Sequence, residues 1–247
     1  MYRYITERVT ESGKYYVFID EIQYVDQFED LLNSLNNAGL DVYITGSNSH
    51  LLSGEISTAL RGRSLEIRVH PLSFAEYFAF SGGEVNSAWK NYVLYGGFPY
   101  AAQEDSLAGK TAYLSMLEQT VATRDVIERH GVRNAHIFNA LYDFLCSNIG
   151  SLVSAKKIAD SLRSAGYGAV SADTIGNYLQ YLCDAFLFYK VCRRDVKGKE
   201  YFRGLNKYYV SDIGLRNVRL NFRQVEITHT LENIISSNCC GAGLWWI

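Results

Sequence analysis

An acidic pair follows a short apolar run near the N-terminus, where residues 17–23 read VFIDEIQ. A carboxylate at the carboxyl end of a parallel strand faces the crevice in which such sheets bind ligands. In nucleotide hydrolases the first acid of such a pair holds magnesium, and the second polarises the attacking water. Asp20 and Glu21 have this order and place, which predicts a magnesium-dependent hydrolytic site. The alternative is that the pair only caps the following helix.

Two further polar groups fit the same chemistry. A second apolar run, VYITGSNS, ends in small polar residues that could reach a γ-phosphate or orient water. LRGR at 60–63 then offers arginines on a loop, which suits a contact with the site of a neighbouring subunit. Each group also has a simpler interpretation, since Ser47 and Asn48 can be helix caps and Arg63 a solvated charge. The prediction of an ATPase site therefore rests on their combination and order.

The elements that must position these residues alternate between strand and helix. Apolar runs predict strands at residues 14–20, 41–48 and 64–72, the first of them fully buried. Helices are predicted over 2–11 and over 28–39, the second closed by Gly39. This alternation predicts an α/β fold with a parallel sheet. A helical region follows from residue 73 to about 148, with breaks at 82–83 and at YGGFP, 95–99.

The phosphate-binding pattern G-x-x-x-x-G-K-[ST] does not occur ahead of the acidic strand. The chain has one GKT, at Gly109-Lys110-Thr111. Glu104 stands where the first glycine of the pattern belongs. In addition, no predicted strand precedes this GKT, and the GKT follows the acidic strand instead of preceding it. We interpret this GKT as the start of a helix.

Residues 151–219 differ from the preceding part in charge. They hold 12 Lys and Arg against 6 Asp and Glu, a net of +6, whereas residues 1–150 hold 11 against 18. Helices are predicted over 151–166 and 170–191, the second with Ser171 as its N-cap. Its apolar residues fall on one face: Ile175, Tyr178, Leu179 and Leu182.

Residues 193–202 and 206–212 then predict a basic hairpin, so that helix, turn, helix and hairpin together predict a winged helix. The second helix would be the major-groove element, and the wing carries Arg193, Arg194, Lys197 and Lys199. The functional interpretation is DNA binding through phosphates, with salt-sensitive affinity. The alternative is a structural winged helix whose wing packs on the acidic part of the chain.

The end of the chain changes character after an apolar helical stretch at 229–235. The residues that follow, SSNCCGAGLWWI, do not continue the apolar helical pattern. Codons exist for this peptide that, read from their third base, give Phe-Glu-Leu-Leu-Arg-Arg-Gly, which would continue the helix. Our hypothesis is a frameshift near residue 236. Elsewhere, the five cysteines lack metal or disulfide spacing, and no apolar run approaches the roughly 18 residues of a membrane span, so we expect a cytoplasmic protein.

Six phrases in one order resemble the prokaryotic AAA-type ATPases that carry a winged-helix domain and a restriction-endonuclease-like C-terminal domain. The resemblance covers roughly residues 1–235. The phrases are VFIDEIQ, VYITGSNSHLLSGE, LRGR, HPLSFAEY, YGGFP and TRDVIER. The resemblance implies magnesium binding by Asp20, water activation by Glu21, sensing by Asn48 and a contact in trans by Arg63. ATP and Mg²⁺ are the implied ligands, and a homo-oligomer is the implied assembly.

The resemblance also implies a domain order. Its parts are a P-loop-type ATPase core truncated to residues 1–80, a helical lid at 81–150, a winged helix at 151–219 and the start of a nuclease-like domain at 220–247. This chain begins after the phosphate loop of that family, so we expect an ATPase fragment that does not hydrolyse ATP alone. Two alternatives stay open: a non-hydrolysing winged-helix module that binds DNA or a protein partner, and a pseudogene product.

Overall fold

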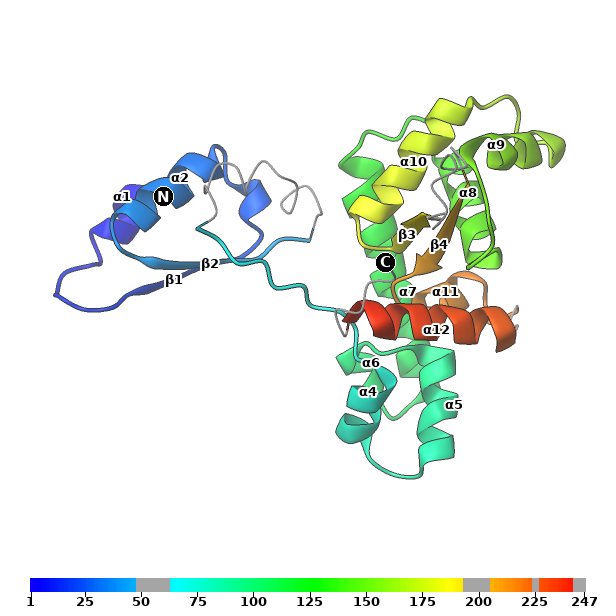
Figure 1. The fold of residues 1–247 in the computed structure, drawn as a ribbon, viewed down its shortest axis with the longest axis horizontal. Helices are drawn as coiled ribbons and strands as arrows, with labels where there is room; N and C mark the ends of the chain where they lie inside the picture. The colour runs from blue at the N-terminus through cyan, green and yellow to red at the C-terminus, as the bar shows by residue number, and fades with distance from the viewer. Residues whose placement is uncertain (48–62, 193–204, 224–226, 242–247) are drawn as a thin grey trace, which may run out of the picture. The chain divides into compact units, whose positions relative to one another are not determined.

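The computed structural model describes residues 1–47, 63–192, 205–223 and 227–241. The chain forms two compact units, Met1–Arg68 and Val69–Ile247, which are drawn in Figure 1. Each unit has its own hydrophobic cluster, and each is described by itself below. Asn48 and the four cations of the predicted wing lie outside the described residues.

The first unit is a strand–helix–strand arrangement. Its elements are α1 (Tyr2–Thr6), β1 (Tyr16–Ile19), the 3-10 helix η1 (Ile22–Tyr24), α2 (Phe28–Asn37) and β2 (Asp41–Ile44). The strands pair in parallel, with Tyr16 opposite Asp41 and Ile19 opposite Ile44. The parallel order and the Gly39 stop, at a φ of +77°, are confirmed. The first helix ends at Thr6, not at residue 11 as predicted.

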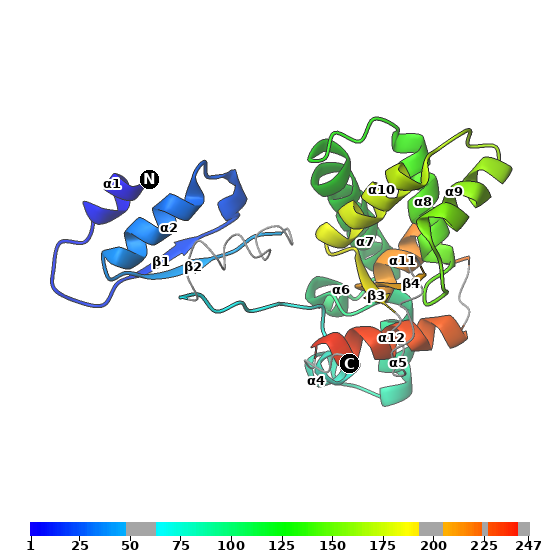
Figure 2. The same cartoon turned by 45° about the horizontal axis from the view of Figure 1, so that its top comes forward.

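One face of this sheet is covered and the other is not. Ile19 packs with Ile22, Leu31, Leu32, Leu35 and Leu40, and Figures 1 and 2 both show α1 and α2 on one side of the strands. On the other face Tyr16 and Tyr43 are half exposed, and Phe18 is 76% exposed. The prediction of a fully buried first strand is therefore wrong. The apolar run at residues 15–19 therefore forms a strand with one buried face and one solvent-exposed aromatic face.

The predicted third strand is also absent from the described part of the chain. Residues 63–70 have no regular secondary structure, and Leu65, Ile67 and Val69 are largely exposed. Their alternation with Glu66 and Arg68 has the period of a strand, which explains the prediction. A strand also needs hydrogen-bonded neighbours, and among the described residues β1 pairs only with β2.

The second unit begins with helices. They are α4 (Phe74–Ser81), α5 (Val85–Tyr95), α6 (Pro99–Gln103), α7 (Leu107–Thr120), the π-helix η3 (Val121–Glu128) and α8 (Ala135–Ser147). Ser73 and Glu76 form a reciprocal capping box at the start of α4. The predicted breaks at residues 82–83 and 95–99 are confirmed, because Gly82 and Gly96 end α4 and α5.

Two helices and a hairpin follow. They are α9 (Ala155–Ser164), α10 (Ala172–Asp184), β3 (Phe188–Cys192) and β4 (Asn206–Val210). The strands are antiparallel, and an isolated bridge joins Val153 to Asn206. Ser171 caps α10, and the predicted apolar face of this helix is buried, as expected. The helix ends at Asp184 and not near residue 191, because FYKVC pairs with β4 as a strand.

The chain closes with α11 (Ile213–Arg219) and α12 (Ile227–Gly241), which lie against each other in Figures 1 and 2. The helix that was expected to end at residue 235 therefore continues through Gly241. Ser236 is buried, and the Ser237 hydroxyl donates to the carbonyl of Asn233 at 3.0 Å. Tertiary packing thus outweighs the poor helix propensity of Ser and Asn. One hydrophobic core joins residues from Tyr77 to Ile234.

Candidate functional site

The carboxyl ends of β1 and β2 bring together the polar residues of the first unit, named here the acidic edge: Asp20, Glu21, Gln23, Thr45 and Ser47. Parallel pairing places the ends of neighbouring strands side by side. The Thr45 hydroxyl donates a hydrogen bond to Asp20 Oδ1 and accepts one of 3.0 Å from the backbone N–H of Glu21. One hydroxyl just after β2 therefore contacts both the Asp20 carboxylate and the Glu21 backbone.

Glu21 is restrained by both its backbone and its side-chain contacts. Its backbone is left-handed, with φ 49° and ψ 56°, and it stands just before η1. Its carboxylate oxygen Oε2 accepts hydrogen bonds from the Gln23 amide and, at 3.2 Å, from the Ser47 hydroxyl. Asp20 is exposed, whereas Glu21 and Gln23 are half buried. Sequence reasoning found both acids but missed Gln23 and Thr45, whose roles depend on contacts across the two strands.

The donor set fits a hard divalent cation. Carboxylate and hydroxyl oxygens suit Mg²⁺, which keeps several waters and is held by one or two carboxylates together with substrate phosphates. Nowhere in the described residues do three His, Cys, Asp or Glu gather as a complete metal cage. The acidic edge thus offers the oxygen donors that Mg²⁺ prefers, but its described residues supply no cradle for a triphosphate.

The GKT at residues 109–111 does not supply a phosphate cradle either. Ser106 caps α7, because its hydroxyl oxygen accepts a 3.0 Å hydrogen bond from the N–H of Gly109. The interpretation of the GKT as the start of a helix is therefore confirmed. Lys110 is buried, and its Nζ donates to the carbonyl oxygen of Ala101 at 2.7 Å. Burial lowers the pKa of Lys110, opposed by the nearby carboxylates of Asp105 and Glu104. This lysine stabilises the join between α6 and α7.

Arg63 is not brought to the acidic edge. Its guanidinium lies 3.4 Å from the side-chain oxygens of Asn33 and Asn37, in the last turns of α2. Because α2 runs back from the carboxyl end of β1 to the start of β2, these turns lie at the opposite end of the strands. The contacts of Arg63 with Asn33 and Asn37 therefore place it away from the acidic edge.

The positive charge of residues 151–219 is partly internal. Arg216 is buried and donates to the carbonyl oxygen of Cys146 at 2.7 Å. Arg219 pairs with Glu118 at 3.0 Å and with Asp143 at 2.5 Å, and Lys207 pairs with Glu232 at 2.6 Å. The net charge of +6 thus overstates the basic surface of this region.

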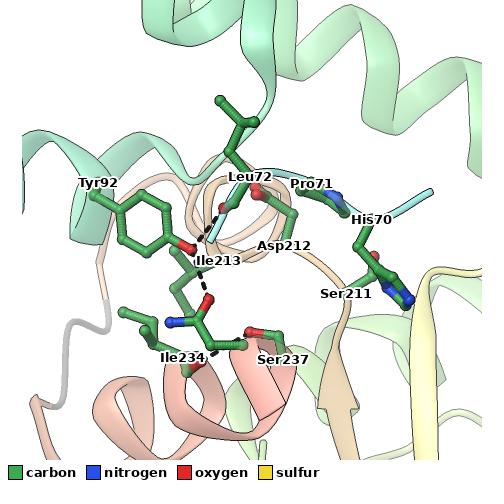
Figure 3. Close-up of a pocket in the computed structure, with 10 residues that line it drawn as sticks. His70, Pro71, Leu72, Tyr92, Ser211, Asp212, Ile213, Ile234 and Ser237 are labelled. Carbon is green, nitrogen blue, oxygen red and sulfur yellow. Dashed lines mark hydrogen bonds between the residues drawn. The ribbon is translucent and has the colours of Figure 1, made fainter. Parts of the chain in front are cut away.

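A small cavity in the second unit is a further polar site, shown in Figure 3. Its volume of about 10 Å³ suits one water molecule. It is lined by His70, Pro71, Leu72, Tyr92, Ser211, Asp212, Ile213, Ile234, Ser237 and Asn238. The Tyr92 hydroxyl lies between the carbonyl oxygen of Leu72, at 2.9 Å, and the Asn238 side chain, at 3.3 Å. The cavity therefore lies where α5, α12 and the segment before α4 meet.

Asp212 at this cavity is a buried carboxylate. It accepts hydrogen bonds from the N–H groups of Gly97 at 2.7 Å, Gly214 at 2.8 Å and Leu215 at 3.4 Å. Burial raises the pKa of Asp212 to about 6, although these three donors favour its ionised form. Gly96 must be glycine here, because a Cβ would lie 2.0 Å from Asp212 Oδ1. The YGGFP phrase therefore has a structural role.

The parallel strand–helix–strand unit with acids at its carboxyl edge is of the kind found in nucleotide-binding α/β proteins. Consistent with this, residues 1–78 match a family model described as an AAA domain. Residues 86–226, more than half of the chain, match a second family, described as a domain of unknown function (DUF8612). The chain belongs to this second family.

Two curated relatives match almost the whole chain. A protein of Haemophilus influenzae described as uncharacterized is 37% identical over 238 residues, covering 94% of this chain and 59% of the relative. An uncharacterized protein of Methanocaldococcus jannaschii is 33% identical over 231 residues, covering 89% of this chain and 51% of the relative. The chain thus spans between half and three-fifths of the length of these relatives. In the described residues, no helix has the length and hydropathy needed to cross a membrane.

Proposed function

We propose that the first unit is the magnesium- and water-binding half of an AAA-type ATP-hydrolysing site. The observation that carries the proposal is the meeting of Asp20 and Glu21 with two hydroxyl side chains that follow β2, Thr45 and Ser47, at one sheet edge. The AAA-domain match over residues 1–78 supports the same class. ATP hydrolysis, Mg²⁺ and an assembly of several copies are parts of this proposal for the whole protein.

Each residue has a distinct role in the proposal. Asp20, exposed and held by Thr45, binds the magnesium ion. Glu21 accepts a proton from the attacking water, because it is the half-buried acid and its carboxylate is fixed by two donors. Asn48 senses the phosphate, and Arg63 acts on the site of a neighbouring copy. Magnesium, when bound, neutralises charge on phosphate oxygens.

Metal binding by the chain tests this proposal directly. We expect Mn²⁺, a spin-active substitute for Mg²⁺, to bind once per chain in electron paramagnetic resonance titrations. Asp20→Asn should weaken binding at least about tenfold, because a carboxylate ligand is lost. Asp26→Asn, which removes another exposed acid of the same unit, is the matched control and should bind as wild type. Equal affinities of the Asp20 and Asp26 variants would refute the proposed site.

ATP binding needs its own measurement, because the sequence lacks the phosphate-loop pattern ahead of the acidic strand. Fluorescent ATP should bind weakly to this chain, and only with Mg²⁺ present. Glu21→Gln should leave that binding in place, since the water-polarising acid is not a required metal ligand. Tight binding without Mg²⁺ would indicate a nucleotide site elsewhere in the chain.

A second candidate function belongs to residues 151–219, where we propose a winged helix that contacts DNA. The order of α9, α10 and the β3–β4 hairpin supports it, as does the Val153–Asn206 bridge, which adds a third strand position. In this scheme residues 81–150 form the lid, and residues 220–247 begin a nuclease-like domain. A protein partner for the same surface is the alternative.

The four wing cations provide the test. Charge reversal at Arg193, Arg194, Lys197 and Lys199 should abolish retention on duplex DNA, and wild-type retention should fall steeply with salt. Reversal of Lys156 and Lys157, which are exposed on α9, is the control for general surface charge. Wild-type retention by the wing variant would exclude DNA contact through the wing.

A further inference from the structure

Glu21 is oriented by a neighbour that sequence patterns did not single out. Resting on the function proposed for the acidic edge, we infer that Gln23 is a positioning residue for the Glu21 carboxylate. Its amide Nε2 donates to Glu21 Oε2 and lies 3.4 Å from Ser47 Oγ, while the Ser47 hydroxyl donates to the same carboxylate oxygen at 3.2 Å. Glu21, Gln23 and Ser47 thus form a closed triangle of polar contacts.

The backbone makes this triangle possible. Residues two apart do not face each other in a regular helix. Glu21 is left-handed, however, and η1 starts directly after it, which turns the side chains of Glu21 and Gln23 toward one another. The residue between them, Ile22, is fully buried, and its N–H donates to the carbonyl oxygen of Thr45 at 3.0 Å. The position of Gln23 is therefore fixed by the core and by β2.

The other end of the Gln23 amide faces no partner among the described residues. Its Oε1 atom is buried and accepts no hydrogen bond there. A buried acceptor without a donor is unfavourable, so water or a ligand hydroxyl is the natural partner. Beside Glu21, this atom can accept the second hydrogen of a water whose first hydrogen faces the carboxylate. Gln23 would then orient both the acid and the water on which it acts.

Order at the Glu21 carboxylate provides the first test, using the full chain and NMR relaxation of side-chain groups. In the wild type we expect rigid signals for the Gln23 amide and the Glu21 side chain. Gln23→Leu keeps the size of the side chain and removes the donor, so the Glu21 order parameter should fall below about 0.6. Gln27→Leu, an exposed glutamine in the same segment, is the matched control and should leave Glu21 rigid.

Metal affinity gives a second readout that simple packing would not change. Gln23→Glu keeps the shape but places a further carboxylate beside Glu21, at the sheet edge that also carries Asp20. Mn²⁺ affinity should then rise about threefold to tenfold, because affinity for hard cations grows with the number of charged ligands. Gln27→Glu adds the same charge away from the triangle and should raise the affinity less than twofold, through weak surface electrostatics.

The outcomes separate this inference from the proposed function. A mobile Gln23 amide in the wild type, or a Glu21 side chain equally rigid in Gln23→Leu, would overturn the positioning role. Where Asp20→Asn does weaken Mn²⁺ binding, equal Mn²⁺ affinities for Gln23→Glu and Gln27→Glu would also overturn the positioning role. Unchanged Mn²⁺ binding by Asp20→Asn would instead overturn the metal site, and the relaxation result would still decide the role of Gln23.

Discussion

The carboxylate of Asp212 accepts a 2.7 Å hydrogen bond from the backbone N–H of Gly97, across 115 residues of sequence. The same carboxylate caps α11 through Gly214 and Leu215. One buried acid therefore ties the turn after α5 to the start of α11, beside the cavity in Figure 3. The glycines of the YGGFP phrase give it the necessary room.

Gly96→Ala should destabilise the second unit by about 2–3 kcal/mol, combining a left-handed backbone with a forced collision. The backbone φ is +74°, and the new Cβ would lie 2.0 Å from Asp212. Gly83→Ala is the matched control, because its φ is +85° but no atom lies within 4 Å of the added Cβ. It should cost only about 1 kcal/mol. Urea unfolding measures both variants, and equal losses would mean that the contact with Asp212 is unimportant.

Asp212 should also make stability depend on pH. Its pKa in the folded protein is raised from 3.8 to about 6, so the folded state binds the proton more tightly than the unfolded state. The stabilisation is fully present below pH 4 and is lost as pH rises through about 6, a change of about 2–3 kcal/mol. Thermal unfolding of wild type and Asp212→Asn from pH 4 to 7 isolates this contribution. Parallel curves for the two proteins would contradict it.

Arg219 should matter more than any exposed ion pair of the chain. Its partner Glu118 is 5% exposed, and burial raises the pKa of this carboxyl while Arg219 lowers it. Arg219→Leu would leave Glu118 buried without its cation, which should cost about 3–5 kcal/mol. The double variant with Glu118→Gln should recover part of that loss.

A surface pair provides the comparison for Arg219. Arg3 and Glu7 are joined at 2.8 Å on an exposed helix, and Arg3→Leu should cost less than about 1 kcal/mol. The denaturant midpoints of the Arg219 and Arg3 variants measure the stability that each ion pair contributes. If Arg219→Leu is no more costly than Arg3→Leu, the buried network does not stabilise the second unit.

The aromatic face of the first unit should promote association without contributing much to its stability. Phe18 is 76% exposed and stacks on Tyr43 with ring centroids 5.1 Å apart. Phe18→Thr should change the free energy of unfolding by less than about 1 kcal/mol, while reducing concentration-dependent association and dye binding. Leu35→Ala, at a fully buried position of α2, should cost about 2–5 kcal/mol. Analytical ultracentrifugation and thermal melts distinguish the two effects.

Local patterns in the sequence predicted much of the fold. Ser171 as an N-cap, Gly39 as a helix end and the buried face of α10 depend on neighbouring residues, so a short window contains the needed information. The meeting of Asp20 with the end of β2 follows from the parallel order of two strands. The sequence by itself therefore determined the position of both acids.

Tertiary structure decided the remaining features, because each depends on partners distant in sequence. Residues 64–70 carry a strand pattern but have no strand neighbour among the described residues, whereas FYKVC becomes a strand because β4 is available. Residues 236–241 stay helical because α12 packs against β4 and α11. Gln23 reaches Glu21 only through a left-handed residue and a buried isoleucine, and Asp212 reaches Gly97 only after the helices between them have packed. No local periodicity encodes such contacts.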